Sequence, residues 1–344
     1  MGVQITELFQ KKEIGFKELS GKTIAIDAHL ALYQFLSTIR QRDGTPLIDM
    51  KGNVTSHLMG IFTRSASLLE KGIKLIYVFD GKPPELKRRT IEERKAVKIE
   101  AQKRFDAAAE KGDLSEMHKF AMRTSRLTPE MIAESKELIS AMGIPIVQAP
   151  SEGEAQAAHI VKSGKAYAVG SQDADSLLFG AERLVRNLSI SSRRKIPGTV
   201  AYTSTSPELI ELSALLNSLG IDREGLIALS MLVGTDFNPK GIKGIGQKGA
   251  LKLVKQFGKN FDAMFASVKW SEYFSFPWQD VFDLIKNMPI TDDYPLDFRS
   301  PEIERIKEIL CDKHDFSKER IESGLGKTID NSEKKSQKGL SDFF

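Results

Sequence analysis

The sequence is poor in the residues that would make it a secreted, membrane-spanning or zinc-binding protein. Cys311 is the single cysteine in 344 residues, so no disulfide can form within the chain and we expect a reducing, intracellular location. There is no apolar run of roughly 18 residues, and the start MGVQITELFQKKE lacks a signal-peptide core, so we expect no membrane segment. One cysteine and five scattered histidines give no tetrahedral zinc spacing, and Cys311 with His314 is half a site at best.

Two common catalytic motifs are also missing. The chain has no complete G-x-x-x-x-G-K-[ST] element, so the GKT triplets at 21–23 and 326–328 are not P-loops. G-x-S-x-G is absent, which weakens a serine-hydrolase interpretation. The formal net charge of +4 says little about partners. The length and the 41% hydrophobic content fit one large α/β domain, or such a domain with a smaller helical attachment.

Short β-branched runs alternate with longer helical patterns, which predicts an α/β fold with a mostly parallel, twisted sheet and helices on both faces. The predicted strands are residues 22–27, 73–80, 144–147, 165–170 and 184–188. Helices are predicted over 55–71 and 128–142, the second beginning with Thr-Pro as N-cap and first helical residue. From Gly225 onward the pattern predicts helices only, followed from about residue 330 by a polar tail.

Residues 82–126 interrupt this rhythm. The segment is poor in apolar residues and carries thirteen basic residues against eight acidic ones. The segment thus has a local charge of +5, and one interpretation is a solvated helix pair with ordinary surface charge.

Acidic residues gather where the predicted strands end. In chain order, the acids that follow the first four strands, with one more from the later loop GTDFNPKG, are Asp27, Asp80, Glu152, Glu154, Asp173, Asp175 and Asp236. Ligands of open α/β sheets bind outside the carboxyl ends of the strands. Parallel strands would therefore bring these acids together at one edge of the sheet.

Each acid also has a local explanation that the sequence leaves open. Glu154 could complete a capping box with Ser151, and Asp27 could cap the helix that follows it. Asp173 and Asp175 could form Asx turns. Almost no Lys or Arg lies beside these acids in the sequence, so we do not expect ion pairing to neutralise them generally.

A cluster of this kind requires cations. Carboxylates about 5 Å apart at an effective dielectric near 20 repel by about 3 kcal/mol per pair. All-oxygen ligands suit Mg²⁺ or Mn²⁺ better than zinc. Two such ions side by side are the usual arrangement for attack of water on a phosphodiester. The cluster therefore predicts a phosphoryl-transfer enzyme.

A glycine-rich turn lies at residues 241–249. Its Gly244 and Gly246 formally fit G-x-G-x-x-G, but a polar loop rather than a strand precedes them, which disfavours a dinucleotide site. The turn enters a predicted helix over 250–256, and backbone N–H groups at a helix start bind phosphate. Residues 240–259 hold six lysines, Lys243 and Lys248 among them, and no acid. A tight turn between core helices is the alternative, and we favour binding to a nucleic-acid backbone.

These motifs together resemble one family. MGV, TIAIDAHLALYQFL, YVFDGKPPELK, APSEGEAQAAHI, SQDADSLLFG and GTDFNPKGIKGIGQKGA are similar, in this order, to segments of the flap endonucleases of archaeal and eukaryotic replication. The resemblance spans nearly the whole chain. It implies a PIN-like nuclease core and a structure-selective 5′ nuclease, with 5′–3′ exonuclease activity, in Okazaki fragment maturation and repair. It also implies a location in the cytoplasm of an archaeal-type cell, or in the nucleus if the cell is eukaryotic.

The resemblance implies a role for each matching residue. Asp27, Asp80, Glu152 and Glu154 would hold one metal and Asp173, Asp175 and Asp236 the second, both Mg²⁺ with Mn²⁺ as a substitute. Lys87 and Arg94 would reach from a helical arch over 82–126 to the scissile phosphate, and Tyr33 would stack on the terminal base.

The resemblance also implies DNA contacts outside the active site. A one-nucleotide 3′ flap would be bound by Arg40, Leu47, Ile48 and Thr55. The hairpin region, about 225–260, would grip downstream duplex together with a K⁺ ion. Ala174, Phe237 and Gln247 depart from the family pattern of a large residue, Tyr and Pro, and none of them replaces a metal ligand.

The tail carries a further motif. Gln337, Leu340, Phe343 and Phe344 fit Q-x-x-φ-x-x-aromatic-aromatic, which resembles the sliding-clamp-binding box. One interpretation is a disordered tail whose apolar end is chance. Adjacent Phe residues are costly to expose, so a partner pocket is the preferred interpretation.

We expect one nuclease domain over 1–330 and a flexible tail over 331–344, in a protein that is monomeric on its own. Two alternatives to a flap endonuclease are an excision-repair or RNA-directed 5′ nuclease, and a catalytically idle DNA-binding adaptor. The seven acids argue against the adaptor, which would have no need to keep such repulsion.

Overall fold

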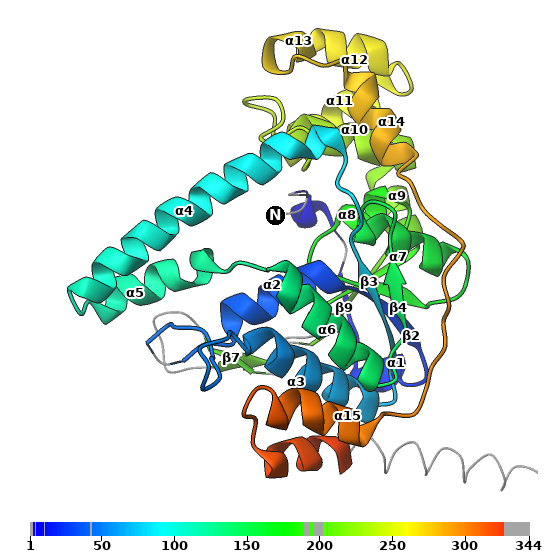
Figure 1. Ribbon diagram of the computed structural model, residues 1–344. Helices are drawn as coiled ribbons and strands as arrows, with labels where there is room; N and C mark the ends of the chain where they lie inside the picture. The colour runs from blue at the N-terminus through cyan, green and yellow to red at the C-terminus, as the bar shows by residue number, and fades with distance from the viewer. Residues whose placement is uncertain are drawn as a thin grey trace, which may run out of the picture.

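A mixed sheet forms the centre of the molecule (Figure 1). The computed structural model describes residues 3, 5–9, 11–41, 43–188, 193–195, 202–204 and 206–326. Within these residues the strands of the main sheet, in spatial order, are β1 (Lys12–Glu13), β9 (Glu208–Glu211), β6 (Arg183–Arg186), β5 (Ala168–Gly170), β2 (Thr23–Asp27), β3 (Lys74–Phe79) and β4 (Ile146–Gln148). A separate hairpin pairs β7 (Arg193–Lys195) with β8 (Tyr202–Ser204).

The five predicted strands are confirmed and parallel. Neighbours from β6 through β5, β2 and β3 to β4 all pair in parallel. The edge that continues through β9 and β1 is antiparallel, which the sequence patterns did not predict. Because the five strands run the same way, their carboxyl ends meet at one edge of the sheet.

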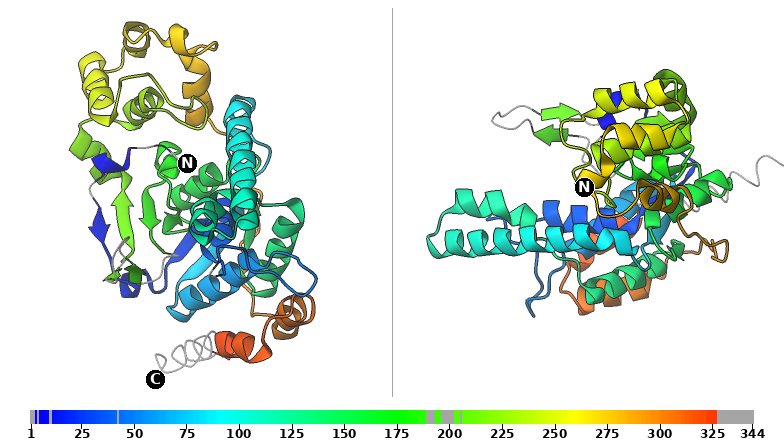
Figure 2. Two further views of the ribbon diagram at one scale, coloured as in Figure 1. Left: turned by 90° about the vertical axis from the view of Figure 1, so that its left-hand side faces the viewer. Right: turned by 90° about the horizontal axis from the view of Figure 1, so that it is seen from above.

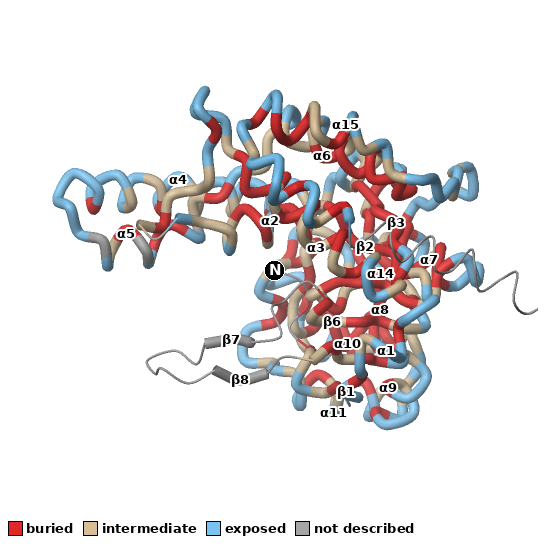
Figure 3. The backbone as a smooth tube through the Cα atoms, turned by 90° about the horizontal axis from the view of Figure 1, so that it is seen from below, coloured by how far each residue is buried: buried red, intermediate tan, exposed pale blue. Residues whose placement is uncertain are grey.

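Helices cover both faces of the sheet, as predicted. Alternate strand residues face opposite sides, so Ala25 packs in one apolar core while Ile24 and Ile26 pack in the other. The helices on the face of Ala25 are α7 (Gly153–Lys162), α8 (Asp175–Leu178), α9 (Leu212–Leu219) and α10 (Arg223–Val233). Those on the opposite face are α1 (Phe16–Leu19), α2 (Ala28–Thr38), α3 (Ser56–Glu70), α6 (Pro129–Ala141) and α15 (Ile303–Lys307). Figure 3 shows the buried backbone concentrated in these layers.

Local signals explain where helices begin. The Thr128 side chain accepts a hydrogen bond from the Met131 amide, and Pro129 is the first residue of α6, as the Thr-Pro pair predicted. The helix predicted over 55–71 is α3, with bounds one residue shorter at each end.

Residues 82–126 form a helical arch that projects from the body (Figures 1 and 2). It consists of η2 (Glu85–Lys87), the long α4 (Arg88–Glu110), α5 (Leu114–Ala121) and η3 (Met122–Thr124). In α4 only Thr90, Ala101 and Ala108 are buried, because the helix packs mainly against α5. The low apolar content of the segment is thus explained by an exposed helix pair.

The C-terminal part is less helical than predicted. After α10 come α11 (Gln247–Phe257), α12 (Phe261–Ser267), α13 (Trp270–Tyr273) and α14 (Trp278–Lys286), and α15 is followed by η4 (Glu308–Asp312). Residues 288–302 between α14 and α15 contain no helix, so the expectation of helices only was wrong there. Pro289, Pro295 and Pro301 interrupt this segment, and a proline in a helix interior removes a hydrogen bond. None of the helices in the described ranges has both the length and the apolarity needed to cross a membrane.

Candidate active site

All seven predicted acids line one cavity of about 680 Å³ between the sheet edge and the arch. Asp27 ends β2, and Asp80 directly follows β3. The other five come from the N-termini of α7 and α8 and from the loop after α10; they are Glu152, Glu154, Asp173, Asp175 and Asp236. The prediction that parallel strands bring these residues together is confirmed.

Two glycines let the β3 end approach the turn before α7. The Gly153 amide donates to Asp80 Oδ1 at 2.6 Å, and a Cβ at Gly153 would lie 2.7 Å from the same atom. The Gly81 amide donates to the Ser151 carbonyl at 2.6 Å, where a Cβ would lie 2.2 Å from the Ala149 carbonyl oxygen. Larger residues at either position would separate the two turns and the acids they carry.

The local explanations for the acids hold in part. Asp27 does cap α2, since its Oδ1 accepts a hydrogen bond from the Leu30 amide. The capping box of Glu154 with Ser151 is wrong, because the Ser151 hydroxyl donates to the Lys82 carbonyl. Glu154 accepts instead from the Ser171 hydroxyl at 2.8 Å. Capping therefore does not account for the position of Glu154.

Burial and mutual repulsion disfavour the charged form of Asp27, Glu154 and Asp175. Burial, together with the neighbouring carboxylates of Asp236 and Asp173, raises the pKa of Asp175 to about 7. Burial is also the main reason why the pKa values of Asp27 and Glu154 lie well above their ordinary range, and in both cases nearby carboxylates add to the shift. Cations that entered this part of the cavity would be stabilised by the same arrangement.

Lys87 and Arg94 supply two such cations. Lys87 Nζ lies 2.5 Å from Glu152 and 3.4 Å from Asp236, and an Arg94 nitrogen lies 2.5 Å from Asp236. Burial lowers the pKa of Lys87, but the carboxylates of Glu152 and Asp236 outweigh it and raise the pKa above its usual value. The sequence excluded ion pairing only as a general explanation, because almost no Lys or Arg lies beside the acids in the sequence. These ion pairs join residues that are far apart in the chain, since Lys87 and Glu152 are separated by 65 residues.

The donor set of the cavity fits hard divalent cations. Its acids offer oxygen ligands only, and three of them, Asp27, Glu154 and Asp175, have pKa values raised by burial and by neighbouring carboxylates. In the described part of the chain no three His, Cys, Asp or Glu side chains converge closely enough to hold one ion as they stand. Glu152 and Asp236 instead face the cationic ends of Lys87 and Arg94, so a metal would have to replace these contacts.

Other residues of the cavity escaped the sequence analysis. His29 accepts a hydrogen bond from the Asp80 amide through Nδ1, and burial lowers the pKa of its ring, so its proton lies on Nε2. Lys98 lies over the ring of Tyr33, 4.2 Å from its centroid. Lys95 and Arg126 also line the cavity. The excess of positive charge in 82–126 indicated the segment but not which of its cations face inward.

The residues predicted for a 3′ flap form one loop beside the arch rather than part of the cavity. Arg40 donates to the Ser125 hydroxyl at 2.8 Å and bridges to Pro46. The Thr55 amide donates to the Leu47 carbonyl, and Ile48 is 53% exposed. Thr55 itself is buried, so its side chain faces the protein.

This loop is anchored by a buried carboxylate. Asp49 accepts hydrogen bonds from the amides of Lys51 and Asn53, and its Oδ2 lies 3.0 Å from His314 Nδ1. Burial raises the pKa of Asp49, but hydrogen bonds from the Asn53 side chain, the Asn53 and Lys51 amides and His314 outweigh it and hold the pKa at about 2. His314 thus fixes the loop to the C-terminal segment.

The glycine-rich turn forms the predicted entry into α11. Gly244 has a φ of 85°, and Gly246 is the N-cap of the helix. Both glycines are exposed and have open space where a Cβ would lie. Lys243 and Lys248 are exposed beside them. The tight turn is therefore at the surface, where backbone amides can meet a ligand.

Comparison with known proteins places the chain in a family. The profile of the XPG N-terminal domain matches residues 1–101, and that of the XPG I-region matches residues 143–236. The chain is 52% identical over 328 residues to flap endonuclease 1 of Aeropyrum pernix, covering 94% of this chain and 93% of that protein. It is 53% identical over 325 residues to flap endonuclease 1 of Thermococcus onnurineus, covering 94% of both. The chain belongs to the flap endonuclease family.

The fold agrees with this family. The solved structure of flap endonuclease-1 from Methanococcus jannaschii is 41% identical, with a TM-score of 0.73, over 95% of this chain and 98% of that one.

The three departures from the flap endonuclease pattern are placed as follows. Ala174 and Phe237 are buried, and Gln247 is the first residue of α11. The Oε1 atom of Gln247 is buried and, among the described residues, has no hydrogen-bond partner.

The raised pKa of Asp175 predicts how pH affects the metal-free protein. An acid with a higher pKa in the folded than in the unfolded chain binds its proton better when folded, so stability falls as pH rises between the two values. For Asp175 these values are 3.8 and about 7. We expect the melting temperature in EDTA to fall across this window, and the increase caused by Mg²⁺ to grow with pH.

The measurement is calorimetric unfolding over this pH range, with EDTA and with saturating Mg²⁺. Asp175→Asn cannot ionise, so its stability in EDTA should depend less on pH than that of the wild type. Equal dependence in the two proteins would show that Asp175 does not titrate in this window.

Proposed function

We propose that this protein is a metal-dependent 5′ flap endonuclease that hydrolyses a phosphodiester bond where duplex DNA meets a 5′ single strand. The observation that carries the proposal is the cavity of seven acids beneath a cationic arch. Family membership supports the same activity, together with 5′–3′ exonuclease activity, in Okazaki fragment maturation and DNA repair. We assign the activity to one nuclease domain over residues 1–330, acting as a monomer on its own.

In this proposal the acids hold two Mg²⁺ ions, or Mn²⁺ in their place. When bound, such ions activate water and stabilise the charge that develops on the phosphate. Four acids, Asp27, Asp80, Glu152 and Glu154, hold one ion, and Asp173, Asp175 and Asp236 hold the other.

The arch contributes to the same step. Lys87 and Arg94 lie at the cavity wall, where their charges stabilise the non-bridging oxygens of the phosphate. Tyr33 is 38% exposed at the cavity, which allows a terminal base to stack on its ring. Burial raises the pKa of the Tyr33 hydroxyl, so the ring stays neutral. The proton of His29 lies on Nε2, and Nδ1 cannot act as a base while it binds the Asp80 amide.

The duplex is held away from the cavity in this proposal. The turn at Gly244 and Gly246 binds the backbone of downstream duplex with Lys243 and Lys248, together with a K⁺ ion. Arg40, Leu47, Ile48 and Thr55 form the pocket for a one-nucleotide 3′ flap, Thr55 through its backbone because its side chain is buried.

Cleavage of defined substrates tests the function. Labelled double-flap, nicked, bubble and single-stranded DNA and an RNA strand are incubated with Mg²⁺, and the cuts are mapped. We expect cleavage at the flap junction, and Asp80→Ala should abolish it while flap binding persists, because the duplex-binding surface is intact. Asp297→Ala, which removes an exposed acid outside the cavity, should be fully active.

Other outcomes select another function. A preference for bubbles or RNA would identify the excision-repair or RNA-directed alternative, which differs in substrate rather than chemistry. Tight binding of flaps without cleavage would identify the adaptor. Near wild-type turnover of Asp80→Ala would remove the metal assignment.

The glycine-rich turn at residues 241–249 predicts how the affinity for DNA depends on salt. Lys243→Ala/Lys248→Ala should weaken binding for all DNA sequences and lower the slope of log affinity against log salt by about one unit per lost phosphate contact. Lys17→Ala/Lys71→Ala removes two exposed lysines elsewhere and is the matched control. A slope equal to that of the control would place the turn away from DNA.

The tail predicts recruitment without a change in chemistry. Gln337, Leu340, Phe343 and Phe344 lie outside the described residues, and we propose from the sequence that they bind a sliding clamp. Each Phe entering an apolar pocket contributes about 1.5–3 kcal/mol. Phe343→Ala/Phe344→Ala should therefore bind the clamp orders of magnitude more weakly while cleaving flap DNA alone at the full rate.

Calorimetric titration with the clamp and cleavage rates with and without it test this prediction. Lys338→Ala, within the same motif, is the control and should bind normally. Unchanged affinity of the double variant would exclude the tail as the tether, and loss of activity without the clamp would place both Phe residues in the folded core.

A further inference from the structure

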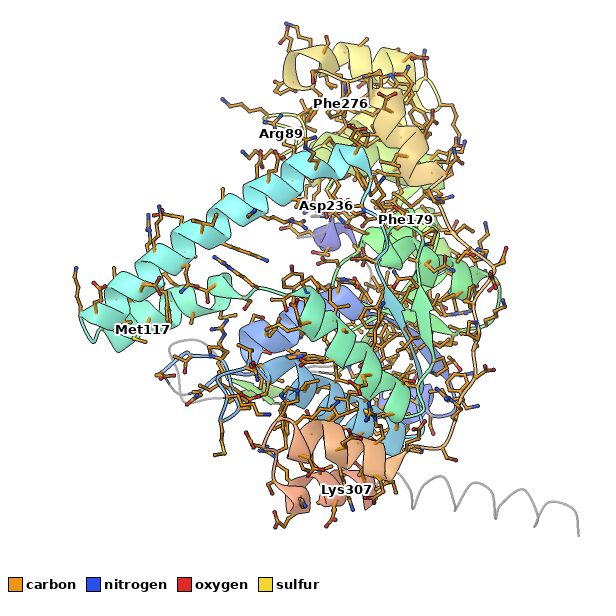
Figure 4. The ribbon with its side chains drawn as sticks, in the orientation of Figure 1. Arg89, Met117, Phe179, Asp236, Phe276 and Lys307 are labelled. Atoms are coloured by element: carbon orange, nitrogen blue, oxygen red, sulfur yellow. The ribbon has the colours of Figure 1, made fainter. Side chains whose placement is uncertain are left out.

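Three side chains of the arch contact the loop that carries Asp236. The three residues are Lys87, Thr90 and Arg94. Their spacing of three and four residues places them on one face at the start of α4, where Lys87 is the N-cap. Lys87 and Arg94 bind the Asp236 carboxylate. Thr90 Oγ1 donates instead to the Asp236 main-chain carbonyl at 2.6 Å, and Thr90 is only 7% exposed. Figure 4 shows Asp236 beneath the end of α4 that joins the body.

These contacts differ in whether they compete with a metal. Lys87 and Arg94 use carboxylate oxygens of Glu152 and Asp236, which are the atoms that the proposed ions require. The acceptor of Thr90 is a main-chain oxygen, so this hydrogen bond uses neither oxygen of the Asp236 carboxylate. Only the Thr90 contact is therefore compatible with a metal on that carboxylate.

The acceptor of Thr90 belongs to a firmly held turn. The buried Thr235 hydroxyl accepts from the amides of Phe237 and Asn238 and donates to Asn238 Oδ1. The Asn238 side-chain nitrogen donates to the Met231 carbonyl, and the Gly241 amide donates to the Asn238 carbonyl. These hydrogen bonds connect the Asp236 turn to the end of α10 and to the start of the glycine-rich turn. The Thr90 hydrogen bond therefore links the arch to a segment that is itself held by several hydrogen bonds.

We propose that Thr90 is a positioning residue for Lys87 and Arg94. Its hydrogen bond holds the start of α4 against the Asp236 turn when metals occupy the carboxylates. Lys87 and Arg94, released from their ion pairs, then stay above the cavity and reach the phosphate. The inference rests on the proposed function for its substrate, and Thr90 itself touches neither metal nor DNA.

A hydroxyl deletion tests this role. Thr90→Val keeps the side-chain shape but leaves the Asp236 carbonyl, whose hydrogen bond with Thr90 is partly buried, without this donor. The single-turnover rate on flap DNA should therefore fall by about tenfold while the dissociation constant changes little. Thr90→Ser retains the hydroxyl and should restore most of the rate. Thr63→Val removes a hydroxyl that donates within α3, to the Met59 carbonyl, and should cleave like the wild type.

A second measurement does not depend on cleavage. Amide hydrogen exchange over residues 88–98 is followed without DNA, with EDTA and with Mg²⁺. We expect Mg²⁺ to leave exchange low in the wild type but to raise it in Thr90→Val, because metals displace the ion pairs and no other of these three contacts then holds the start of α4. In Lys87→Ala/Arg94→Ala, Thr90→Val should cause no further loss of rate, since both residues that it positions are gone.

The outcomes separate the two proposals. Thr90→Val with a wild-type rate and wild-type exchange would overturn the positioning role, as would Thr90→Ser being as slow as Thr90→Val. If the wild-type protein does not cleave flap DNA, the proposed function fails, and hydrogen exchange still decides whether Thr90 holds the arch when Mg²⁺ is present.

Discussion

Repulsion among buried carboxylates is the constraint on which the rest of this structure depends. Seven acids line one cavity, and burial raises the pKa of Asp27, Glu154 and Asp175. At an effective dielectric near 20, two charged groups about 5 Å apart repel by about 3 kcal/mol. The protein therefore has to bring cations to the cavity, and the start of α4 supplies Lys87 and Arg94. The arch and the acid cluster are thus parts of one electrostatic arrangement.

The parallel sheet is what makes the cluster rigid enough to persist. Asp27 and Asp80 lie at the ends of neighbouring parallel strands with apolar residues on both faces. The close approach at Gly81 and Gly153 brings the α7 turn against the β3 end through backbone hydrogen bonds. Separating the acids would require breaking these hydrogen bonds and disturbing the apolar packing on both faces of the sheet. Both therefore oppose the repulsion between the acids.

Features set by local pattern could be predicted from the sequence, and features set by distant contacts could not. Strand positions, the N-cap of α6 and the acids at strand ends follow from residue type and spacing. The ion pair of Arg94 with Asp236 joins residues 142 apart, and no nearby residue indicates it. The inward orientation of Lys98 and the antiparallel edge depend in the same way on how elements pack. The prolines of 288–302 could have been used to predict the interruption, because proline is unfavourable in a helix interior.

The capping role of Asp27 does not exclude the metal-binding role that we propose for it. A carboxylate has two oxygens, and Oδ1 of Asp27 accepts the Leu30 amide while Oδ2 is not needed for the cap. The same bond orients the side chain and lowers its pKa, against burial and Asp80, which raise it. A capping residue at a strand end is therefore well suited to become a metal ligand, because α2 already holds its carboxylate in place. The helix cap and the proposed metal ligand, which the sequence left open as alternatives for this acid, are therefore compatible with one position.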